Sequence, residues 1–419
     1  MSRRFHTLSD WLQWLETLHP VEIDLGLERI KQVADKLQLY QFDKKPAIIS
    51  VAGTNGKGSF VATLKALLLA NKENVGAYTS PHILRYNERI ALNHTFAQDE
   101  EICAAFEKID KARGDISLSY FEFGTLAAFL LFKEKQLNYW LCEIGLGGRL
   151  DAVNILDPDI AVITSIDLDH QQWLGDSREL IAIEKAGILR KNGTLVLSET
   201  DEPATLTDCI GANKAQCYRL GLDYRLEQKT GQYQYQSEQA NFHWQSATPL
   251  QLPLPSVAAA LKTAELLKQL PDESTLAAIM NGLQLPGRMQ KATYGKTNII
   301  LDVAHNPAAC AHLAKQLEGG DKHNALIAMM KDKDLSENLK PLIPYIETWH
   351  CCDLKNTPRA ASARQLADTL KALGVKPEQI HCHESPADAL PTCTAYNSGT
   401  LLVFGSFFTV EAVLRKISH

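Results

Sequence analysis

The residues whose types and spacing most clearly indicate chemistry form a glycine-rich turn at 52–59, which reads Ala-Gly-Thr-Asn-Gly-Lys-Gly-Ser. The apolar, β-branched run at 48–51 predicts a strand before the turn, and helix-forming residues with apolar side chains at helical spacing follow from Phe60. Glycines let backbone N–H groups surround an anion at the positive end of a helix, while Lys57 would add a charge and Ser59 a hydroxyl for a metal ion. The spacing departs from the usual G-x-x-x-x-G-K-[ST], yet the flanking strand and helix favour a nucleotide phosphate site over a plain glycine turn.

Polar residues accompany three other apolar stretches that read as strands, at 75–79, 139–144 and 160–166. Ser80 follows the first, Glu143 lies inside the second, and His170 comes shortly after the third. Ligands of open α/β sheets bind at the carboxyl ends of strands, so these side chains are candidates for one site. A carboxylate in an apolar strand is costly unless it is paired or metal-bound, which favours a metal role for Glu143 and makes His170 a candidate for the same ion. Ser80 precedes a proline, so ordinary turn chemistry explains it equally well.

The elements that must position these residues alternate between strand and helix patterns, which predicts an α/β fold. A small antiparallel appendage is expected around 216–250, where short alternating pieces are rich in Tyr and Gln. We place the domain boundary at the break Leu285-Pro286-Gly287-Arg288, which gives domains at 1–288 and 289–419. The second domain has five strand candidates, at 298–303, 325–330, 348–353, 379–383 and 401–404.

A second polar cluster belongs to this later domain. Its first strand ends in Asp302-Val303-Ala304-His305-Asn306, and Ser406 follows its last strand. Asp, His and Asn at one strand end favour a binding role over a simple turn. The two clusters together predict ATP on the first domain and an acceptor over which the second domain closes.

Two short helical patterns precede the glycine-rich turn. Ser9 reads as the N-cap of the first, Gly26 breaks the pattern, and the second continues through about Leu39. The residues alone favour a packing hairpin of helices here. By the same standard Lys185, on a helix expected to end near Gly193, is an ordinary exposed lysine.

Composition argues against several classes of function. The 419 residues carry a net charge of −6 and a pI near 6.1 without a long Lys/Arg run, so no nucleic-acid partner is expected. The sequence has no signal-peptide pattern and no uninterrupted apolar run of about twenty residues, which predicts a cytoplasmic protein with no membrane association. Nine cysteines without a C-x-x-C pair argue against a disulfide framework and against a structural zinc site.

Taken in order, the motifs resemble those of the dihydrofolate synthase/folylpolyglutamate synthase family of the Mur ligase superfamily over nearly the whole chain. The matching stretches are 24–29, 53–59, 80–82, 119–125, 143–151, 169–170, 184–187, 285–288 and 302–307. Each is weak alone, whereas their joint order is highly specific. The resemblance implies an α/β protein with an N-terminal P-loop ATPase domain around a mostly parallel sheet and a smaller C-terminal Rossmann-like α/β domain.

The resemblance also implies roles for individual residues. The residues that would contact ATP are Thr54, Asn55, Gly56, Lys57, Gly58, Ser59, Arg288 and Asp302. The ligands of two Mg²⁺ ions would be Ser80, Glu143, His170 and a carbamylated Lys185. The acid substrate would be contacted by Asp24, Leu25, Gly26, Leu27, Ser119, Tyr120, Phe121, Glu122 and Leu150, which replaces the packing role expected around Asp24. The incoming glutamate would lie near His305 and Ser406, and the catalytic candidates are Lys57, Lys185 and His305.

One position departs from the family pattern. Ser256 stands where family members usually carry an Asn that contacts ATP. A serine hydroxyl lacks the paired donor and acceptor of an amide. We therefore expect altered nucleotide affinity or base selectivity, with Ser256 still near the nucleotide and the phosphates still bound.

The implied activity is ATP-dependent ligation of L-glutamate to dihydropteroate and to reduced folates through an acyl phosphate, by a monomer whose partners are small molecules. A monovalent cation is a possible further cofactor. Folylpolyglutamate synthase activity alone is the first alternative. A Mur peptidoglycan ligase is disfavoured because only some fifty residues precede Gly53, and a P-loop switch is disfavoured by the second polar cluster. A nucleotide-binding scaffold without turnover is the least specific alternative.

Overall fold

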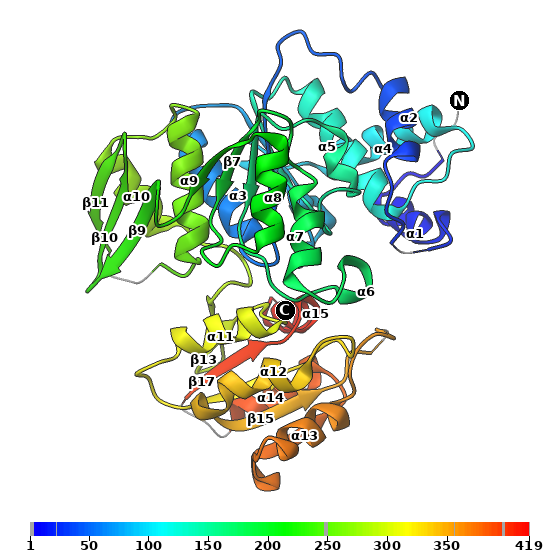
Figure 1. Cartoon of the computed structure of the whole chain (residues 1–419). Coiled ribbons are helices and arrows are strands. Elements are labelled where there is room, and N and C mark those ends of the chain that lie inside the picture. Colours follow the sequence, from blue (N-terminus) through cyan, green and yellow to red (C-terminus); the bar gives the residue numbers. More distant parts are fainter. Residues whose placement is uncertain (1–3, 22, 247–249, 356, 396–398, 419) are drawn as a thin grey trace. The chain divides into compact units, whose positions relative to one another are not determined.

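The computed structural model describes residues 4–21, 23–246, 250–355, 357–395 and 399–418 (Figure 1). The chain forms two compact units. Unit 1 spans Met1–His82 and Tyr86–Leu283, and unit 2 spans Ile83–Arg85 and Gln284–His419. Each unit is an α/β structure built around its own sheet.

Unit 1 contains an eight-stranded sheet in the order β4-β3-β2-β5-β1-β6-β7-β8. Its strands are β1 (Ala47–Ala52), β2 (Val75–Tyr78), β3 (Ile90–Leu92), β4 (Thr95–Phe96), β5 (Tyr139–Glu143), β6 (Ile160–Ile163), β7 (Thr194–Leu197) and β8 (Gln216–Arg219). The six strands from β2 to β8 in this order are parallel, and β3 and β4 add an antiparallel edge. The expected mostly parallel sheet is confirmed, and it brings the ends of β1, β5 and β6 side by side.

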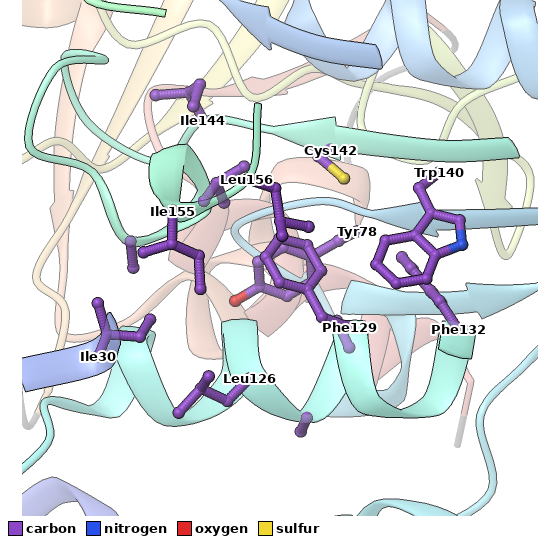
Figure 2. Packing of buried hydrophobic residues seen from close by; sticks show 14 of the residues in the cluster. Ile30, Tyr78, Leu126, Phe129, Phe132, Trp140, Cys142, Ile144, Ile155 and Leu156 are labelled. Atoms are coloured by element: carbon purple, nitrogen blue, oxygen red, sulfur yellow. The ribbon is translucent and has the colours of Figure 1, made fainter. Parts of the chain in front are cut away.

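Helices cover both faces of this sheet. The α-helices of unit 1 are α1 (Leu8–Leu18), α2 (Glu28–Lys36), α3 (Lys57–Ala70), α4 (Asp99–Arg113), α5 (Tyr120–Glu134), α6 (Gln171–Leu174), α7 (Arg178–Ala186), α8 (Ala204–Asn213), α9 (Leu254–Leu266) and α10 (Glu273–Gly282). Successive strand residues point to opposite faces, so Ile48 joins the core with α5 while Ile49 points toward the other face, where α3 packs against β1 and α9. Figure 2 shows the α5 side, where the Phe129 ring stacks on Trp140 with centroids 5.8 Å apart.

The appendage differs from the expectation at its start. Only β9 (Tyr224–Lys229), β10 (Gln232–Ser237) and β11 (Asn241–Gln245) form the antiparallel sheet, whereas β8 pairs in parallel with β7. The expected antiparallel stretch around 216–250 was therefore wrong for β8, because α8 provides a crossover that returns the chain to the main sheet. Residues 247–249 lie outside the described part of the chain.

Two helix limits also differ from the expectation. Thr7 is the N-cap of α1, since its Oγ1 accepts a hydrogen bond from the Asp10 N–H at 3.1 Å, so Ser9 as cap was wrong. Ser9 lies inside the first turn instead. Helix α7 ends at Ala186 rather than near Gly193, because the backbone turns at Gly187 close to Arg149.

Unit 2 contains a six-stranded sheet in the order β12-β13-β17-β14-β15-β16. Its strands are β12 (Gln290–Tyr294), β13 (Thr297–Leu301), β14 (His323–Ile327), β15 (Ile346–Cys352), β16 (Ile380–His383) and β17 (Thr400–Phe404). Its α-helices are α11 (Pro307–Gln316), α12 (Leu335–Leu339), α13 (Ala363–Ala372), α14 (Pro386–Ala395) and α15 (Phe407–Ile417). All five expected strands are present and parallel, and the hairpin strand β12 was not foreseen.

In the described ranges, no helix has the length and apolar character needed to cross a membrane. The nine cysteines are all free thiols.

Candidate active site

The glycine-rich turn connects β1 to α3 in unit 1 and has no room for side chains at two positions. Gly56 is the N-cap of α3 with φ 88°, and a Cβ there would lie 2.2 Å from Ser256 Oγ. Gly53 has φ 153°, and its Cβ would lie 1.9 Å from Thr164 Oγ1. The backbone therefore requires glycine at both positions, and the first N–H groups of α3 have no partner within the helix and remain available to an anion.

The segment after β6 holds the outer half of this turn. Thr54 Oγ1 donates to the Asp167 carbonyl and accepts from the Asp167 N–H, both at 3.0 Å. The Asn55 N–H donates to Ser165 Oγ at 2.9 Å, and Thr164 Oγ1 donates to the Asn55 carbonyl at 2.6 Å. The Thr54 hydroxyl, expected among the phosphate contacts, is thus engaged in shaping the loop.

Two side chains of the turn have the character that a bound phosphate and its cation require. Lys57 Nζ donates to the Gly53 carbonyl at 2.8 Å, so its charge lies over the turn. Ser59 is 1% exposed and its hydroxyl has no hydrogen-bond partner in the part of the chain that the structure describes, which is costly unless a ligand supplies one. The hydroxyl therefore fits a site completed by a nucleotide and its metal ion.

Glu143 and Ser80 meet at the adjacent strand ends. Glu143 is the last residue of β5, is 5% exposed and pairs in register with Val51 of β1. The Ser80 N–H donates to Glu143 Oε2 at 3.3 Å, so the backbone of Ser80 lies against this carboxylate. His170 is the N-cap of α6 with φ 51°, and its side chain is 36% exposed.

Lys185 corrects the expectation of an ordinary exposed lysine. Its side chain lies on α7 and only 3% of the residue is exposed. Burial, together with the nearby charge of Lys57, lowers the pKa of its amine to about 7, while Asp169 opposes the shift. The amine makes no hydrogen bond or ion pair with the described residues. Sequence alone could not show this, because the burial depends on residues far away along the chain.

The side chains at these strand ends fit a metal ion only if His and carboxylate ligands are combined with other kinds of donor. Across the described ranges, no three His, Cys, Asp or Glu side chains are arranged to hold a metal. Glu143 and His170 supply two such groups, so a metal here also needs the Ser80 or Ser59 hydroxyl, a modified Lys185, phosphate oxygens or water. Oxygen-rich sets completed by phosphates and water are typical of Mg²⁺.

A glycine-rich loop at 145–150 separates these residues from α5. A Cβ on Gly145 would lie 2.6 Å from the Phe121 ring, and one on Gly148 would lie 2.6 Å from the Glu184 carbonyl. Asp151 ends the loop and accepts hydrogen bonds from the N–H groups of Leu146 at 2.8 Å and Val153 at 2.9 Å. Burial raises the pKa of Asp151 to about 6. Sequence analysis assigned no role to this carboxylate, although its position after three glycines was a usable signal.

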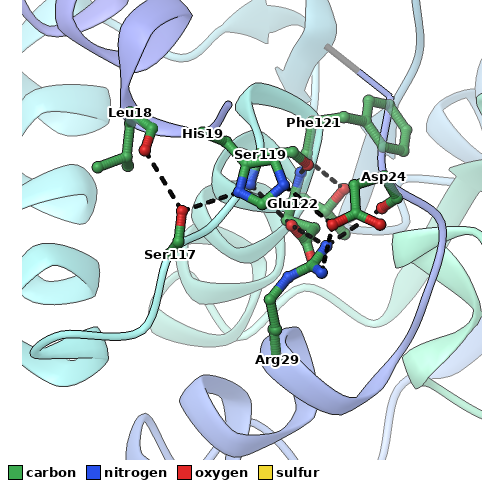
Figure 3. Close-up of polar contacts among 9 residues, drawn as sticks. Leu18, His19, Asp24, Arg29, Ser117, Ser119, Phe121 and Glu122 are labelled. Atoms are coloured by element: carbon green, nitrogen blue, oxygen red, sulfur yellow. Dashed lines mark hydrogen bonds and ion pairs between the residues drawn. The ribbon is translucent and has the colours of Figure 1, made fainter. Parts of the chain in front are cut away.

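Residues far apart in sequence meet at the start of α5 (Figure 3). The members of this group, here called the α5 corner, are His19, Asp24, Arg29, Ser117 and Glu122. Asp24 Oδ2 accepts from Arg29 Nη1 at 2.5 Å and from His19 Nε2 at 2.9 Å. Arg29 Nη2 lies 3.3 Å from both oxygens of Glu122, and His19 Nδ1 lies 2.8 Å from Ser117 Oγ. His19, Arg29 and Ser117 were not predicted as part of the site.

The other candidates for the acid substrate lie around this corner. Ser119 caps α5 in a capping box with Glu122, whose carboxylate accepts from the Ser119 N–H at 2.7 Å. The Gly26 N–H donates to the Leu150 carbonyl at 3.3 Å, so the segment 24–27 reaches the 145–150 loop. The structure thus brings together the residues expected to contact the acid.

The candidates in unit 2 form a separate polar cluster. Asp302 accepts from the N–H groups of Met289 and Ala304, both at 2.9 Å, and burial raises its pKa while Arg288 opposes the shift. His305 Nδ1 lies 2.8 Å from the Val303 carbonyl. Ser406 Oγ accepts from the Thr409 N–H at 3.1 Å as the N-cap of α15. Asp302 and Ser406 therefore already hold backbone N–H groups of unit 2, and any ligand contact would be an additional role for these side chains.

The glycine-rich turn at 52–59, called the phosphate turn below, lies beside the polar residues that follow β2 and end β5. Together with the two α/β units, this arrangement defines a nucleotide-dependent enzyme of the Mur ligase type. The Mur ligase middle domain matches residues 115–260, and the Mur ligase glutamate ligase domain matches residues 287–407. A dihydrofolate synthase/folylpolyglutamate synthase of Haemophilus influenzae is 39% identical, with 96% of each chain covered.

Solved structures agree with this assignment. E. coli FolC in complex with DHPP and ADP has a TM-score of 0.91 and 37% identity, covering 100% of this chain and 99% of that chain. A bifunctional folylpolyglutamate synthase/dihydrofolate synthase with Mn, AMPPNP and L-glutamate bound has a TM-score of 0.88 and 39% identity, with 100% of both chains covered. The chain belongs to the dihydrofolate synthase/folylpolyglutamate synthase family.

Proposed function

We propose that this protein ligates L-glutamate to dihydropteroate and to reduced folates, using ATP and passing through an acyl phosphate. The observation that carries the proposal is the common strand edge of unit 1, where the phosphate turn adjoins Glu143 and the buried Lys185. The relatives support it, because solved family members hold ADP, DHPP, AMPPNP, Mn and L-glutamate.

ATP binds through the N–H groups at the start of α3 and through Lys57, with Ser256 near the nucleotide and Arg288 and Asp302 as further contacts. Two Mg²⁺ ions fit the oxygen and nitrogen donors of Ser80, Glu143, His170 and a modified Lys185. Bound Mg²⁺ would neutralise charge on the phosphate oxygens. A monovalent cation is a further possible cofactor, and no residue is assigned to it.

Lys185 is the proposed carbamylation site. Its amine is buried without a hydrogen-bond partner in the described structure, and an uncharged amine can attack carbon dioxide. Carbamylation turns this amine into a carboxylate-like group with two oxygens. The burial of a group that otherwise lacks partners supports this assignment.

The chain's own residues would then perform the ligation in two steps. Lys57 holds the γ-phosphoryl group in line with the acid's carboxylate, whose oxygen attacks phosphorus and releases ADP. The glutamate amine, held near His305 and Ser406, attacks the acyl carbon, loses a proton and expels phosphate. Asp24, Leu25, Gly26, Leu27, Ser119, Tyr120, Phe121, Glu122 and Leu150 orient the acid so that its carboxylate is the group presented.

The same proposal places the protein in the cytoplasm as a monomer with small-molecule partners only. The nine free thiols suit a reducing compartment.

Phosphate release from ATP and Mg²⁺ tests the proposal in reactions with dihydropteroate plus glutamate, tetrahydrofolate plus glutamate, each acid alone, and no acid. We expect release that requires both acid and glutamate, with products heavier by one glutamate residue. Glutamate-dependent release with tetrahydrofolate but not with dihydropteroate would restrict the activity to polyglutamylation. Acid-independent release would instead indicate a P-loop switch. A scaffold without turnover predicts no release in any reaction, and Glu143→Ala would then leave every phenotype unchanged.

A further inference from the structure

Arg89 differs from every other described arginine of unit 1 because none of the carboxylates in the described ranges pairs with it. The others each form an ion pair with Asp or Glu, namely Arg4, Arg29, Arg113, Arg149, Arg178, Arg190, Arg219 and Arg225. Arg89 is half-buried, and the one hydrogen bond of its side chain among the described residues runs from Nε to His82 Nδ1 at 2.9 Å. Both terminal amino groups of its guanidinium are therefore available to a ligand.

Two aromatic rings flank the guanidinium of Arg89. Its Cζ lies 5.5 Å from the ring centroid of Tyr86 and 5.6 Å from that of Tyr120, and these two rings meet edge to face at 5.7 Å. Burial raises the pKa of Tyr120 to about 12 and that of Tyr86 well above its usual value, so neither phenol supplies a counter-charge near neutral pH. The rings hold the guanidinium plane by cation–π contact while His82 fixes its Nε side.

A guanidinium fixed in this way matches an oxyanion. Its two outer N–H groups form a planar fork, which binds a carboxylate or a phosphate through two parallel hydrogen bonds. A half-buried cation without a counter-ion is also more costly than a paired one, so an anionic ligand would remove that cost. An oxyanion of a bound ligand would supply the missing partner.

The position of Arg89 indicates which anionic group of the ligand would bind there. Tyr120 lies in the first turn of α5, next to Ser119, among the residues proposed to hold the acid. His82 follows Ser80, a proposed metal ligand, by two residues. A reduced folate that already carries glutamate has a carboxylate that does not react, whereas dihydropteroate has only the reacting one.

We propose that Arg89 binds the non-reacting carboxylate of the glutamylated acid substrate and thereby favours reduced folates over dihydropteroate. This inference rests on the proposed function, since it assumes that the α5 region holds the acid. Arg89 is then a specificity residue for the second of the two ligations.

The test measures dissociation constants of tetrahydrofolate and dihydropteroate, and KM values for both acids and L-glutamate, in the wild type, Arg89→Gln and Arg89→Lys. We expect Arg89→Gln to weaken tetrahydrofolate binding and raise its KM roughly tenfold or more, with dihydropteroate and glutamate values within about twofold. Arg89→Lys should recover part of the loss, because it keeps the charge without the fork. Arg225→Gln, on the exposed appendage, is the matched control and should change nothing.

Three results would overturn the inference. Equal losses for both acids together with a lower melting temperature would show a structural role for Arg89. A rise confined to the KM of L-glutamate would assign the fork to the incoming amino acid. Unchanged tetrahydrofolate binding would show that the fork is empty in the complex. Binding of both acids by a wild type that ligates neither would contradict the proposed function alone, and the binding constants would still decide the role of Arg89.

Discussion

The phosphate turn and the α5 corner are two polar regions of unit 1 that are built in opposite ways. The turn is a continuous segment of eight residues whose shape comes from glycine backbones and from neighbours on the next strand. The α5 corner joins side chains more than ninety positions apart, such as Arg29 with Glu122 and His19 with Ser117. A site made of backbone should therefore fail when a side chain is added, and a site made of side chains should fail when one is removed.

The largest effect is expected from adding a methyl group to the turn. In Gly56→Ala the new Cβ would meet Ser256 Oγ at 2.2 Å, and the residue would have to keep φ 88°. Displacement of the phosphate donors should lower kcat/KM for ATP by roughly hundredfold. Steady-state kinetics with ATP varied would measure this.

Two further variants sharpen that test. Ser256→Ala removes the hydroxyl in conflict, so Gly56→Ala combined with Ser256→Ala should recover part of the activity. Gly211→Ala, in α8 with open space around its Cβ position, is the control and should leave kinetics unchanged. Wild-type ATP kinetics in Gly56→Ala would contradict a backbone-built site.

In the α5 corner the largest loss should come from removing the Arg29 guanidinium. Arg29→Gln leaves Asp24 and the 3% exposed Glu122 side chain without the guanidinium between them. We expect KM for the acid to rise roughly tenfold while KM for ATP changes little, with about 2 kcal/mol lost from the free energy of unfolding. Acid-dependent kinetics and urea denaturation would measure the two effects.

The matched variant is Glu122→Gln, which keeps a side chain able to complete the capping box. Added to Arg29→Gln, it should restore part of the stability because it removes one of the unpaired charges. Strict additivity of the two losses would show that Arg29 and Glu122 do not interact.

The comparison also shows what a sequence can reveal. The turn, its flanking β1 and α3, and the parallel strands were predictable because glycine positions and apolar periodicity are local signals. The burial of Lys185, the pairing of β8 with β7 and the open fork of Arg89 were not, because each depends on which distant segments are neighbours. In the α5 corner, only Asp24 and Glu122 were predicted as site residues, and only through the family resemblance. Spacing alone was insufficient, because His19 and Arg29 each have a partner more than ninety positions away in the sequence.

A pH measurement tests whether Lys185 beside the turn is a free amine. Its pKa is about 7 in the folded protein against 10.5 for an ordinary lysine, so the unfolded chain binds more protons between those values. With carbon dioxide excluded, so that the proposed carbamate does not form, the free energy of unfolding should therefore rise with pH above 7, by up to about 1.4 kcal/mol per pH unit for this group. Lys185→Met should lack this slope between about pH 7 and pH 9 in thermal or urea unfolding. Equal slopes in both proteins would show that the wild-type amine is already modified.

The smallest effect on the free energy of unfolding is expected at the N-cap of α1, the helix that leads into the α5 corner. Thr7 caps α1, which ends directly before His19, so Thr7→Ala should cost about 1 kcal/mol of stability. Ser9→Ala, inside the first turn, should change the free energy of unfolding by less than about 0.5 kcal/mol. Urea denaturation would measure both variants. A larger loss of unfolding free energy in Ser9→Ala than in Thr7→Ala would contradict Thr7 as the N-cap.

The acyl phosphate is tested most directly by following oxygen from the acid. Tetrahydrofolate labelled with ¹⁸O in its reacting carboxylate would be incubated with the wild-type protein, ATP, Mg²⁺ and L-glutamate, and the released phosphate analysed by mass. Attack by the carboxylate on the γ-phosphoryl group predicts one ¹⁸O atom in each phosphate formed per ligation. Phosphate free of label, with product still formed, would contradict the acyl phosphate and with it the proposed mechanism.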